Sequence, residues 1–136
     1  MIPVYSKQDP TILLHILNKE VSYERKDISP VNEFLQVSCF KLKNNKTFRP
    51  HKHIYKTRNT CDVITQETWI IVEGSVKVTL YDLDDTVIHE DVLVKGDCTI
   101  TFRGGHNYTS LSDNTLVYEV KTGPYEGREL DKTFIQ

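Results

Sequence analysis

The sequence has 136 residues, of which 38% are hydrophobic and 26% charged, with 17 lysines and arginines against 19 aspartates and glutamates. A chain of this length forms one domain, and its net charge of −2 excludes the strongly basic surface that nucleic-acid binding needs. It has no apolar run of the ~18 residues that a membrane span requires, no signal peptide, and no Cys-x-x-Cys pair among its three cysteines. We therefore expect a cytoplasmic protein that binds neither nucleic acid nor a membrane.

The first 33 residues contain the one helical pattern of the chain. Asp9 is a suitable N-cap, and Pro10 suits the first turn of a helix. Apolar residues then recur at helical spacing, at Ile12, Leu13, Ile16 and Leu17. This pattern predicts a short N-terminal helix within a lead-in segment over residues 1–33.

From residue 34 onward, the sequence is typical of short strands separated by turns. Apolar and polar residues alternate, and glycine, asparagine and aspartate punctuate the segments. The predicted strands cover residues 34–42, 48–53, 68–72, 76–80, 86–94, 98–102, 106–111 and 116–121. Such short, evenly spaced strands predict an antiparallel all-β sandwich or barrel over residues 34–121. The tail, residues 122–136, contains a Gly-Pro step that disfavours another central strand, and it could cover a sheet edge or a neighbouring subunit.

Candidate metal ligands begin with the pair His51 and His53. In a strand, both side chains point to one face about 6.6 Å apart, so both imidazoles can reach one ion at about 2.1 Å; two exposed or structural histidines are the alternative. Glu67 opens an apolar strand, where a buried carboxylate needs a partner such as a metal ion. His106 follows a glycine break, Gly104–Gly105, between two predicted strands.

The histidine pair and the glutamate resemble the first motif of the cupin superfamily, G-x5-H-x-H-x(3,4)-E-x6-G. The matching positions are His51, His53, Glu67 and Gly74. The spacing from the glutamate to the glycine is that of the motif, whereas residues 54–66 form a much longer spacer before Glu67. This spacer looks like a loop inserted at the mouth of the barrel. Asn45 stands where the motif begins with glycine, and asparagine tolerates turn dihedrals.

The segment from Gly96 to His106 is similar to the second cupin motif, G-x5-P-x-G-x2-H-x3-N. Gly96 and Gly104 match its glycines, Phe102 replaces its proline, and His106 comes one residue early. On a continuous strand, a shift of one residue would turn the histidine to the opposite face. The flexible Gly104–Gly105 pair can absorb this shift.

The resemblance covers residues 45–121 and implies a double-stranded β-helix, the cupin jelly-roll barrel, with the whole chain as one cupin domain. It implies that four side chains bind a divalent metal ion: His51, His53, Glu67 and His106. Mixed nitrogen and oxygen ligands suit Fe, Mn, Ni or Zn and do not select among them. The chain is also similar to small bacterial cupins associated with surface-polysaccharide and sugar biosynthesis, and the resemblance implies a homodimer.

Five further side chains are predicted to contact a small-molecule ligand: Arg49, Lys56, Arg58, Trp69 and Tyr108. Strand alternation places Arg49, Trp69 and Tyr108 on the faces that carry the metal ligands. The inserted loop would place Lys56 and Arg58 at the entrance. The alternatives are a structural ion pair for Arg49, a core position for Trp69 and solvated loop positions for the other two cations. A small hydroxylated or anionic ligand suits these residues.

Four protein ligands leave one or two positions on the ion for water or substrate, as catalysis requires. We therefore expect a metal-dependent enzyme that acts on a small sugar-like or carboxylated metabolite by isomerase, epimerase or lyase chemistry. An Fe(II)-dependent dioxygenase and a non-catalytic sugar- or metabolite-binding module are the alternatives. No sequence pattern identifies a catalytic residue beyond the ligands of the ion.

Overall fold

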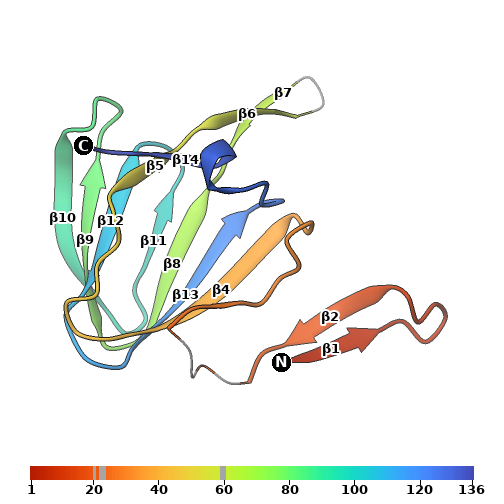
Figure 1. Ribbon diagram of the computed structural model, residues 1–136. Coiled ribbons are helices and arrows are strands. Elements are labelled where there is room, and N and C mark those ends of the chain that lie inside the picture. Colours follow the sequence, from red (N-terminus) through yellow and green to blue (C-terminus); the bar gives the residue numbers. More distant parts are fainter. Residues whose placement is uncertain (20, 22–23, 59–60) are drawn as a thin grey trace.

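The computed structural model describes residues 1–19, 21, 24–58 and 61–136, except for the side chain of Arg58. It consists of two five-stranded antiparallel sheets and two separate hairpins (Figure 1). The first sheet contains, in spatial order, β10 (Val87–Val94), β9 (Ser75–Tyr81), β12 (Gly105–Ser110), β5 (His51–His53) and β14 (Lys132–Phe134). The second contains β11 (Cys98–Thr101), β8 (Glu67–Glu73), β13 (Thr115–Thr122), β4 (Leu35–Leu42) and β3 (Lys26–Asp27). The hairpins are β1 (Ile2–Tyr5) with β2 (Leu13–Leu17), and β6 (Tyr55–Arg58) with β7 (Cys61–Ile64); a 3-10 turn, η1 (Arg128–Leu130), precedes β14.

The predicted all-β fold is confirmed, because each of the eight predicted strands is present. Seven of them differ from the prediction by a single residue at one or both ends, whereas the predicted segment 48–53 is shortened to β5. Pro50 explains the late start, since proline has no N–H to donate to a neighbouring strand. The two sheets share one core in a jelly-roll arrangement, although hydrogen bonds between the described strands do not close them into a continuous barrel.

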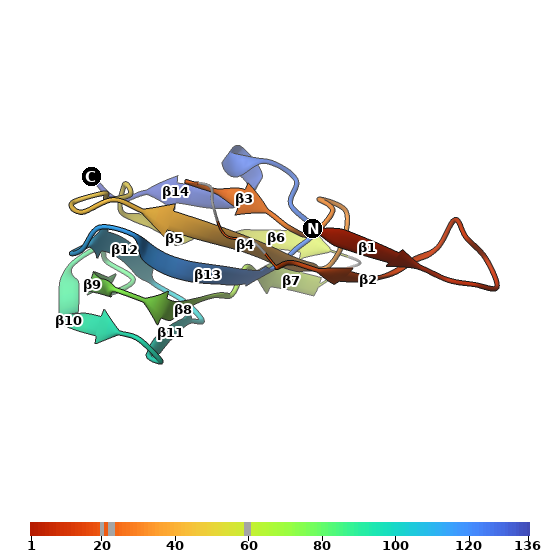
Figure 2. The ribbon, with the colours of Figure 1, turned by 90° about the horizontal axis from the view of Figure 1, so that it is seen from below.

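The N-terminal segment forms the β1–β2 hairpin, so the predicted helix is wrong. Ile2 pairs with Leu17, and the hairpin extends away from the sheets in both views (Figures 1 and 2). The Asp9 carboxylate accepts hydrogen bonds from the backbone N–H and the hydroxyl of Thr11, at 2.9 and 2.6 Å, and thereby stabilises the hairpin turn instead of capping a helix. A helix this short is marginal in isolation, whereas pairing with β1 satisfies the backbone of β2.

The interior is apolar at one end and polar at the other. Inward-facing residues of both sheets form the core cluster, which consists of Phe40, Leu42, Trp69, Ile71, Val76, Val78, Tyr108 and Val117. Further along the same strands, the buried positions become polar: Gln36 and Ser38 on β4, Glu67 on β8, Glu119 and Lys121 on β13, and His106 on β12. The apolar core at one end of these strands therefore holds in place a group of buried polar side chains at the other end.

None of the described residues belongs to a helix with the length and hydrophobicity of a membrane span. The spacer between His53 and Glu67, predicted as an inserted loop, carries strands β6 and β7 (Figure 1).

Candidate metal centre

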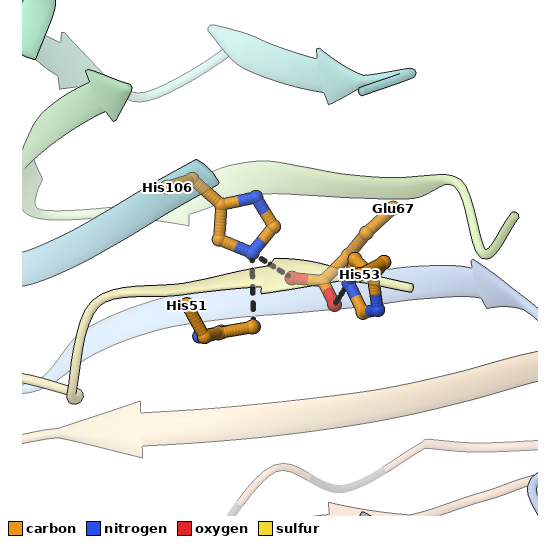
Figure 3. A group of neighbouring side chains, drawn as sticks. All are labelled: His51, His53, Glu67 and His106. Atoms are coloured by element: carbon orange, nitrogen blue, oxygen red, sulfur yellow. Dashed lines mark hydrogen bonds and ion pairs between the residues drawn. The ribbon is translucent and has the colours of Figure 1, made fainter. Parts of the chain in front are cut away.

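Four buried side chains converge at the polar end of the interior: His51, His53, Glu67 and His106 (Figure 3). Each offers one ligand atom, and these atoms all lie within 4.8 Å of one another. The Nε2 atom of His106 lies 3.2 Å from Glu67 Oε1, and the Nε2 atom of His53 lies 3.3 Å from Glu67 Oε2. The structure thus brings together the four residues that the cupin motifs indicate, from strands β5, β8 and β12.

The glycine pair before His106 gives this histidine its place. Gly104 has a φ of +77°, and a Cβ atom at this position would lie 2.5 Å from the carbonyl oxygen of Tyr81. Only glycine adopts such a conformation without strain. The chain then enters β12 with His106 opposite His51 in the register, so the shift of one residue in the motif does not remove His106 from the site.

Two of the imidazoles have a defined tautomer when neutral. The Nδ1 atom of His51 lies 3.1 Å from the carbonyl oxygen of Arg49, and that of His53 lies 3.2 Å from the carbonyl oxygen of Asp131. A carbonyl oxygen only accepts, so each Nδ1 must carry the proton and donate it. The Nε2 atoms of both rings are then left with a lone pair that points into the centre. Such partners on the far nitrogen orient histidine ligands in metal proteins.

The donor set fits a divalent metal ion. Two lone-pair nitrogens and the carboxylate of Glu67 face one small volume, and such acceptors repel one another unless a cation lies between them. The third ring is held by a side chain, because His106 Nδ1 lies 3.0 Å from the hydroxyl of Thr101. Imidazole and carboxylate ligands together suit Fe, Mn, Ni or Zn. Trp69 Nε1 donates to Glu67 Oε1 at 3.1 Å and so fixes the carboxylate.

The electrostatics of the four side chains are strongly perturbed. Burial, together with the neighbouring His106, lowers the pKa of His51 to about 3, so this ring is neutral at pH 7. Burial also disfavours the charged form of His53, but its hydrogen bonds to Asp131 and Glu67 outweigh burial and raise its pKa to about 9. Burial acts against the Glu67 carboxylate, yet His106 and His53 hold its pKa well below the usual range. At neutral pH this raised pKa favours a proton on His53, and a metal ion bound by the four side chains would take the place of that proton.

No protein-family model and no curated protein matches the sequence. Solved structures do match it. KdgF from Halomonas is 19% identical over 72% of this chain and 76% of its own, with a TM-score of 0.56. CapF, solved with the inhibitor 3-isopropenyl-tropolone, is 18% identical over 89% of this chain, with a TM-score of 0.67. Oxalate decarboxylase from Bacillus subtilis is 18% identical over 82% of this chain, with a TM-score of 0.61.

These neighbours are cupins. The chain has a cupin fold. It spans 34% of the CapF chain and 27% of the oxalate decarboxylase chain, so it corresponds to about a third or a quarter of those proteins. At these identities the likeness is one of fold, and the four buried ligands are this chain's own evidence for a metal-binding cupin site.

In this cupin fold, Asp131 of the C-terminal segment supports one of the ligands. It is 1% exposed, and its Oδ1 atom accepts hydrogen bonds from Lys56 Nζ and the Thr65 hydroxyl, both at 2.8 Å. Its Oδ2 atom lies 3.4 Å from Lys121 Nζ and 3.4 Å from His53 Nδ1. Sequence reasoning missed Asp131, because it lies outside the cupin motifs and far along the chain from His53, Lys56 and Thr65.

A polar cavity of about 280 Å³ lies beside the metal ligands. Its charged lining consists of Arg25, Asp27, Glu119, Lys121, Arg128 and Lys132. Lys132 joins the cavity to the metal ligands, since its Nζ atom lies 3.2 Å from His51 Nε2. Burial raises the pKa of Glu119 and lowers the pKa of Lys132. Neither Glu119 nor Lys132 was predicted as a site residue, because no local pattern indicates that either side chain points inward at this centre.

The predicted ligand-contact residues have varied positions. Trp69 and Tyr108 stack on each other in the core cluster, with ring centroids 4.1 Å apart. Lys56 is nearly buried, and its ammonium pairs with Asp131 rather than with solvent. Arg49 is exposed, because β5 begins only after Pro50 and strand alternation does not extend back to it; its guanidinium lies 4.2 Å from the ring centroid of Phe134. The side chain of Arg58 lies outside the described part of the structure.

Proposed function

We propose that this chain is a divalent-metal-dependent enzyme that acts on a small sugar-like or carboxylated metabolite, by isomerase, epimerase or lyase chemistry. The observation that carries the proposal is the convergence of three imidazoles and one carboxylate in a buried site beside a charged cavity. His51, His53, Glu67 and His106 would hold the ion. When bound, such an ion polarises a carbonyl or hydroxyl oxygen and stabilises the negative charge that develops on it.

The surrounding side chains supply the other requirements of such a reaction. The cavity of about 280 Å³ has room for a small metabolite. Arg25 donates to Glu119 Oε1 at 3.3 Å and fixes that carboxyl group in the cavity. Since burial and the nearby Glu67 raise the pKa of Glu119, its carboxyl group can hold or move a proton nearer to neutral pH than an ordinary glutamate can. We therefore assign the proton-transfer role in this proposal to Glu119.

The chemistry of the named structural neighbours is compatible with this ligand class. Oxalate decarboxylase is named for oxalate, a small dicarboxylate, and CapF was solved with a tropolone inhibitor. Oxalate and tropolones both present two adjacent oxygen atoms, which can reach a single metal ion together. These two neighbours support a small, oxygen-rich ligand for this chain. We propose carbohydrate biosynthesis as its context, on the resemblance to small bacterial cupins associated with sugar biosynthesis.

Metal analysis tests the premise that the chain binds a divalent metal ion, which the proposed enzyme shares with the alternative functions. We expect protein purified without added metal to contain one equivalent of a divalent ion, and the His51→Ala/His53→Ala variant to lose it. His89→Ala is the control, because His89 is exposed on β10 and lies outside the centre. Wild-type protein that takes up no Fe, Mn, Ni or Zn would refute the proposal.

Turnover assays then distinguish the kinds of function. Metal-loaded protein incubated with a panel of sugar acids and hydroxy acids should convert one of them without consuming oxygen. Oxygen uptake would favour the dioxygenase alternative. A ligand that binds but is recovered unchanged would favour a binding module.

We further propose a cytoplasmic homodimer. All three cysteines are free, which suits a reducing compartment. The β1–β2 hairpin carries apolar side chains that are about half exposed, such as Ile2 (48%) and Leu14 (53%), and a second copy could bury them. Light scattering after size exclusion tests this state, and a monomer at micromolar concentration would contradict it.

A further inference from the structure

Lys132 occupies an unusual place for a lysine. It lies on β14, opposite His53 in the strand register, and its side chain is half-buried. The Nζ atom lies 3.2 Å from His51 Nε2, the nitrogen that also faces His106 Nε2 at 3.2 Å. Because His51 Nδ1 donates to a carbonyl oxygen, its Nε2 atom is the acceptor, and the ammonium of Lys132 is the donor.

Among the described residues, Lys132 differs from the other cations of the cavity in having no carboxylate within ion-pair distance. Arg25 pairs with Asp27 and Glu119, and Lys121 pairs with Asp131. Arg128 pairs with its neighbour Glu129 at 2.9 Å. Glu67, Glu119 and Asp131 attract this half-buried ammonium from beyond ion-pair distance, and its one hydrogen bond to a neutral imidazole compensates for lost hydration only in part.

Metal binding and this hydrogen bond are mutually exclusive. His51 Nε2 has a single lone pair, and the same lone pair would bind the metal ion. With the ion in place, Lys132 loses the acceptor that it has now, and a second positive charge lies close to it. An anionic oxygen of a ligand bound at the centre would restore a hydrogen bond to the lysine and would offset both positive charges.

We propose that Lys132 exchanges its hydrogen bond to His51 for one to an anionic oxygen of the metal-bound ligand, and that it thereby selects small carboxylates over their neutral analogues. This assignment depends on the metal centre of the proposed function and defines the charge of its substrate. The adjacent cavity of about 280 Å³ limits the ligand to a small acid. Lys132 is thus a ligand-anchoring residue contributed by the C-terminal segment.

The test compares two matched probes, glycolate and glycolamide, which differ in a single charged group. Calorimetry with Mn²⁺-loaded protein gives the affinity for each probe in wild type, Lys132→Met and Lys132→Gln. We expect both substitutions to weaken glycolate binding about 10- to 100-fold, as for the loss of a hydrogen bond to a charged group, and to change glycolamide binding less than about 2-fold. The control is Lys77→Met, since Lys77 lies on β9 of the same sheet and pairs with Glu90 on the surface.

A second readout does not depend on the probes. Because Lys132 competes with the ion for His51, Lys132→Met should bind Mn²⁺ at least as tightly as wild type does. A Mn²⁺ affinity that falls in both variants would show that the lysine supports the centre instead and would overturn the assignment.

The remaining outcomes are also decisive. Unchanged glycolate binding in Lys132→Met, or an equal loss of both probes, would overturn the assignment of Lys132 while leaving the metal centre intact. If wild-type protein binds no Mn²⁺ or other divalent ion, the metal centre itself is refuted, and the assignment falls with it. Full Mn²⁺ stoichiometry in either variant establishes that the variant is folded.

Discussion

The Nδ1 atom of His53 lies 3.2 Å from the carbonyl oxygen of Asp131 and 3.4 Å from its carboxylate, so one residue near the C-terminus orients a ligand on β5. The same carboxylate neutralises two buried lysines, Lys56 and Lys121. The orientation of a metal-ligand candidate, His53, therefore depends on a residue that belongs to neither cupin motif.

Replacing Asp131 by asparagine should weaken the metal centre and the fold together. Loss of a carboxylate behind a histidine ligand typically lowers metal affinity about 10- to 100-fold. It also leaves two buried ammonium groups without their anion, which should cost about 3–5 kcal/mol of unfolding free energy. Metal titration and urea unfolding measure the two effects. Asp85→Asn is the control, because Asp85 pairs with Lys52 at the surface and should change neither value appreciably.

Lys56→Met should lower the metal affinity indirectly, through Asp131, because Lys56 is not itself one of the four metal-ligand candidates. Its ammonium is 2.8 Å from Asp131 Oδ1, and both side chains are nearly buried. We expect lower stability, by about 3 kcal/mol or more, together with a reduced metal affinity. Arg49→Met, on an exposed side chain, should change the metal affinity less than about 2-fold. Equal metal affinities in wild type and Lys56→Met would contradict this account.

In the metal-free protein, the contribution of His51 and His53 to the free energy of unfolding should be largest near pH 6.5. His53 has a pKa of about 9 in the folded chain, above the unfolded value of 6.5, so its stabilisation is present below pH 6.5 and is lost as the pH rises towards 9. His51 has a folded pKa of about 3, so the unfolded chain binds its proton first, and stability falls as the pH drops from 6.5 towards 3.

Urea unfolding in the presence of a chelator, at pH 5, 6.5 and 8.5, measures this dependence. The His51→Ala/His53→Ala variant supplies the background of all other groups, and the difference between the two curves should peak near pH 6.5. A bound metal ion should remove the loss at high pH, because it replaces the proton on His53. A difference that rises steadily from pH 5 to 8.5 without metal would be inconsistent with these pKa values.

Gly104→Ala tests the turn that places His106. A side chain at a φ of +77°, with its Cβ atom 2.5 Å from a backbone oxygen, should cost about 1–3 kcal/mol. The turn would have to shift, and the metal affinity should fall with it. Gly96→Ala is a matched control, since Gly96 has a φ of +96° but its Cβ atom would meet nothing within 4 Å. We expect Gly96→Ala to lower stability without altering metal binding.

Much of the fold follows from local patterns. The alternation of apolar and polar residues predicts the strands to within a residue in most cases, and Asn45 takes the positive φ, 61°, that the motif glycine would have. The four metal-ligand candidates are indicated by spacing, because motif positions on neighbouring strands meet at one end of the sheets.

The features that could not be predicted from local sequence patterns depend on tertiary contacts. The spacing of Ile12 to Leu17 suits a helix, but the pairing of β2 with β1 determines the outcome. Asp131 and Lys132 reach the centre because β14 pairs with β5. No local sequence pattern predicts that pairing. Arg49 was assigned by extending strand alternation beyond Pro50, where no strand exists.

The edge position of β14 has a consequence for the dynamics of the molecule. Among the described strands, this three-residue strand pairs with β5 alone, so its local opening should require less free energy than global unfolding. Its boundaries are marked by two backbone hydrogen bonds, from Ile54 N–H to Asp131 and from Ile135 N–H to Pro50. A ligand that binds only the closed form stabilises it by mass action. Hydrogen exchange at these two amides, which lie at the edge of the sheet, should therefore slow when a ligand binds at the metal centre.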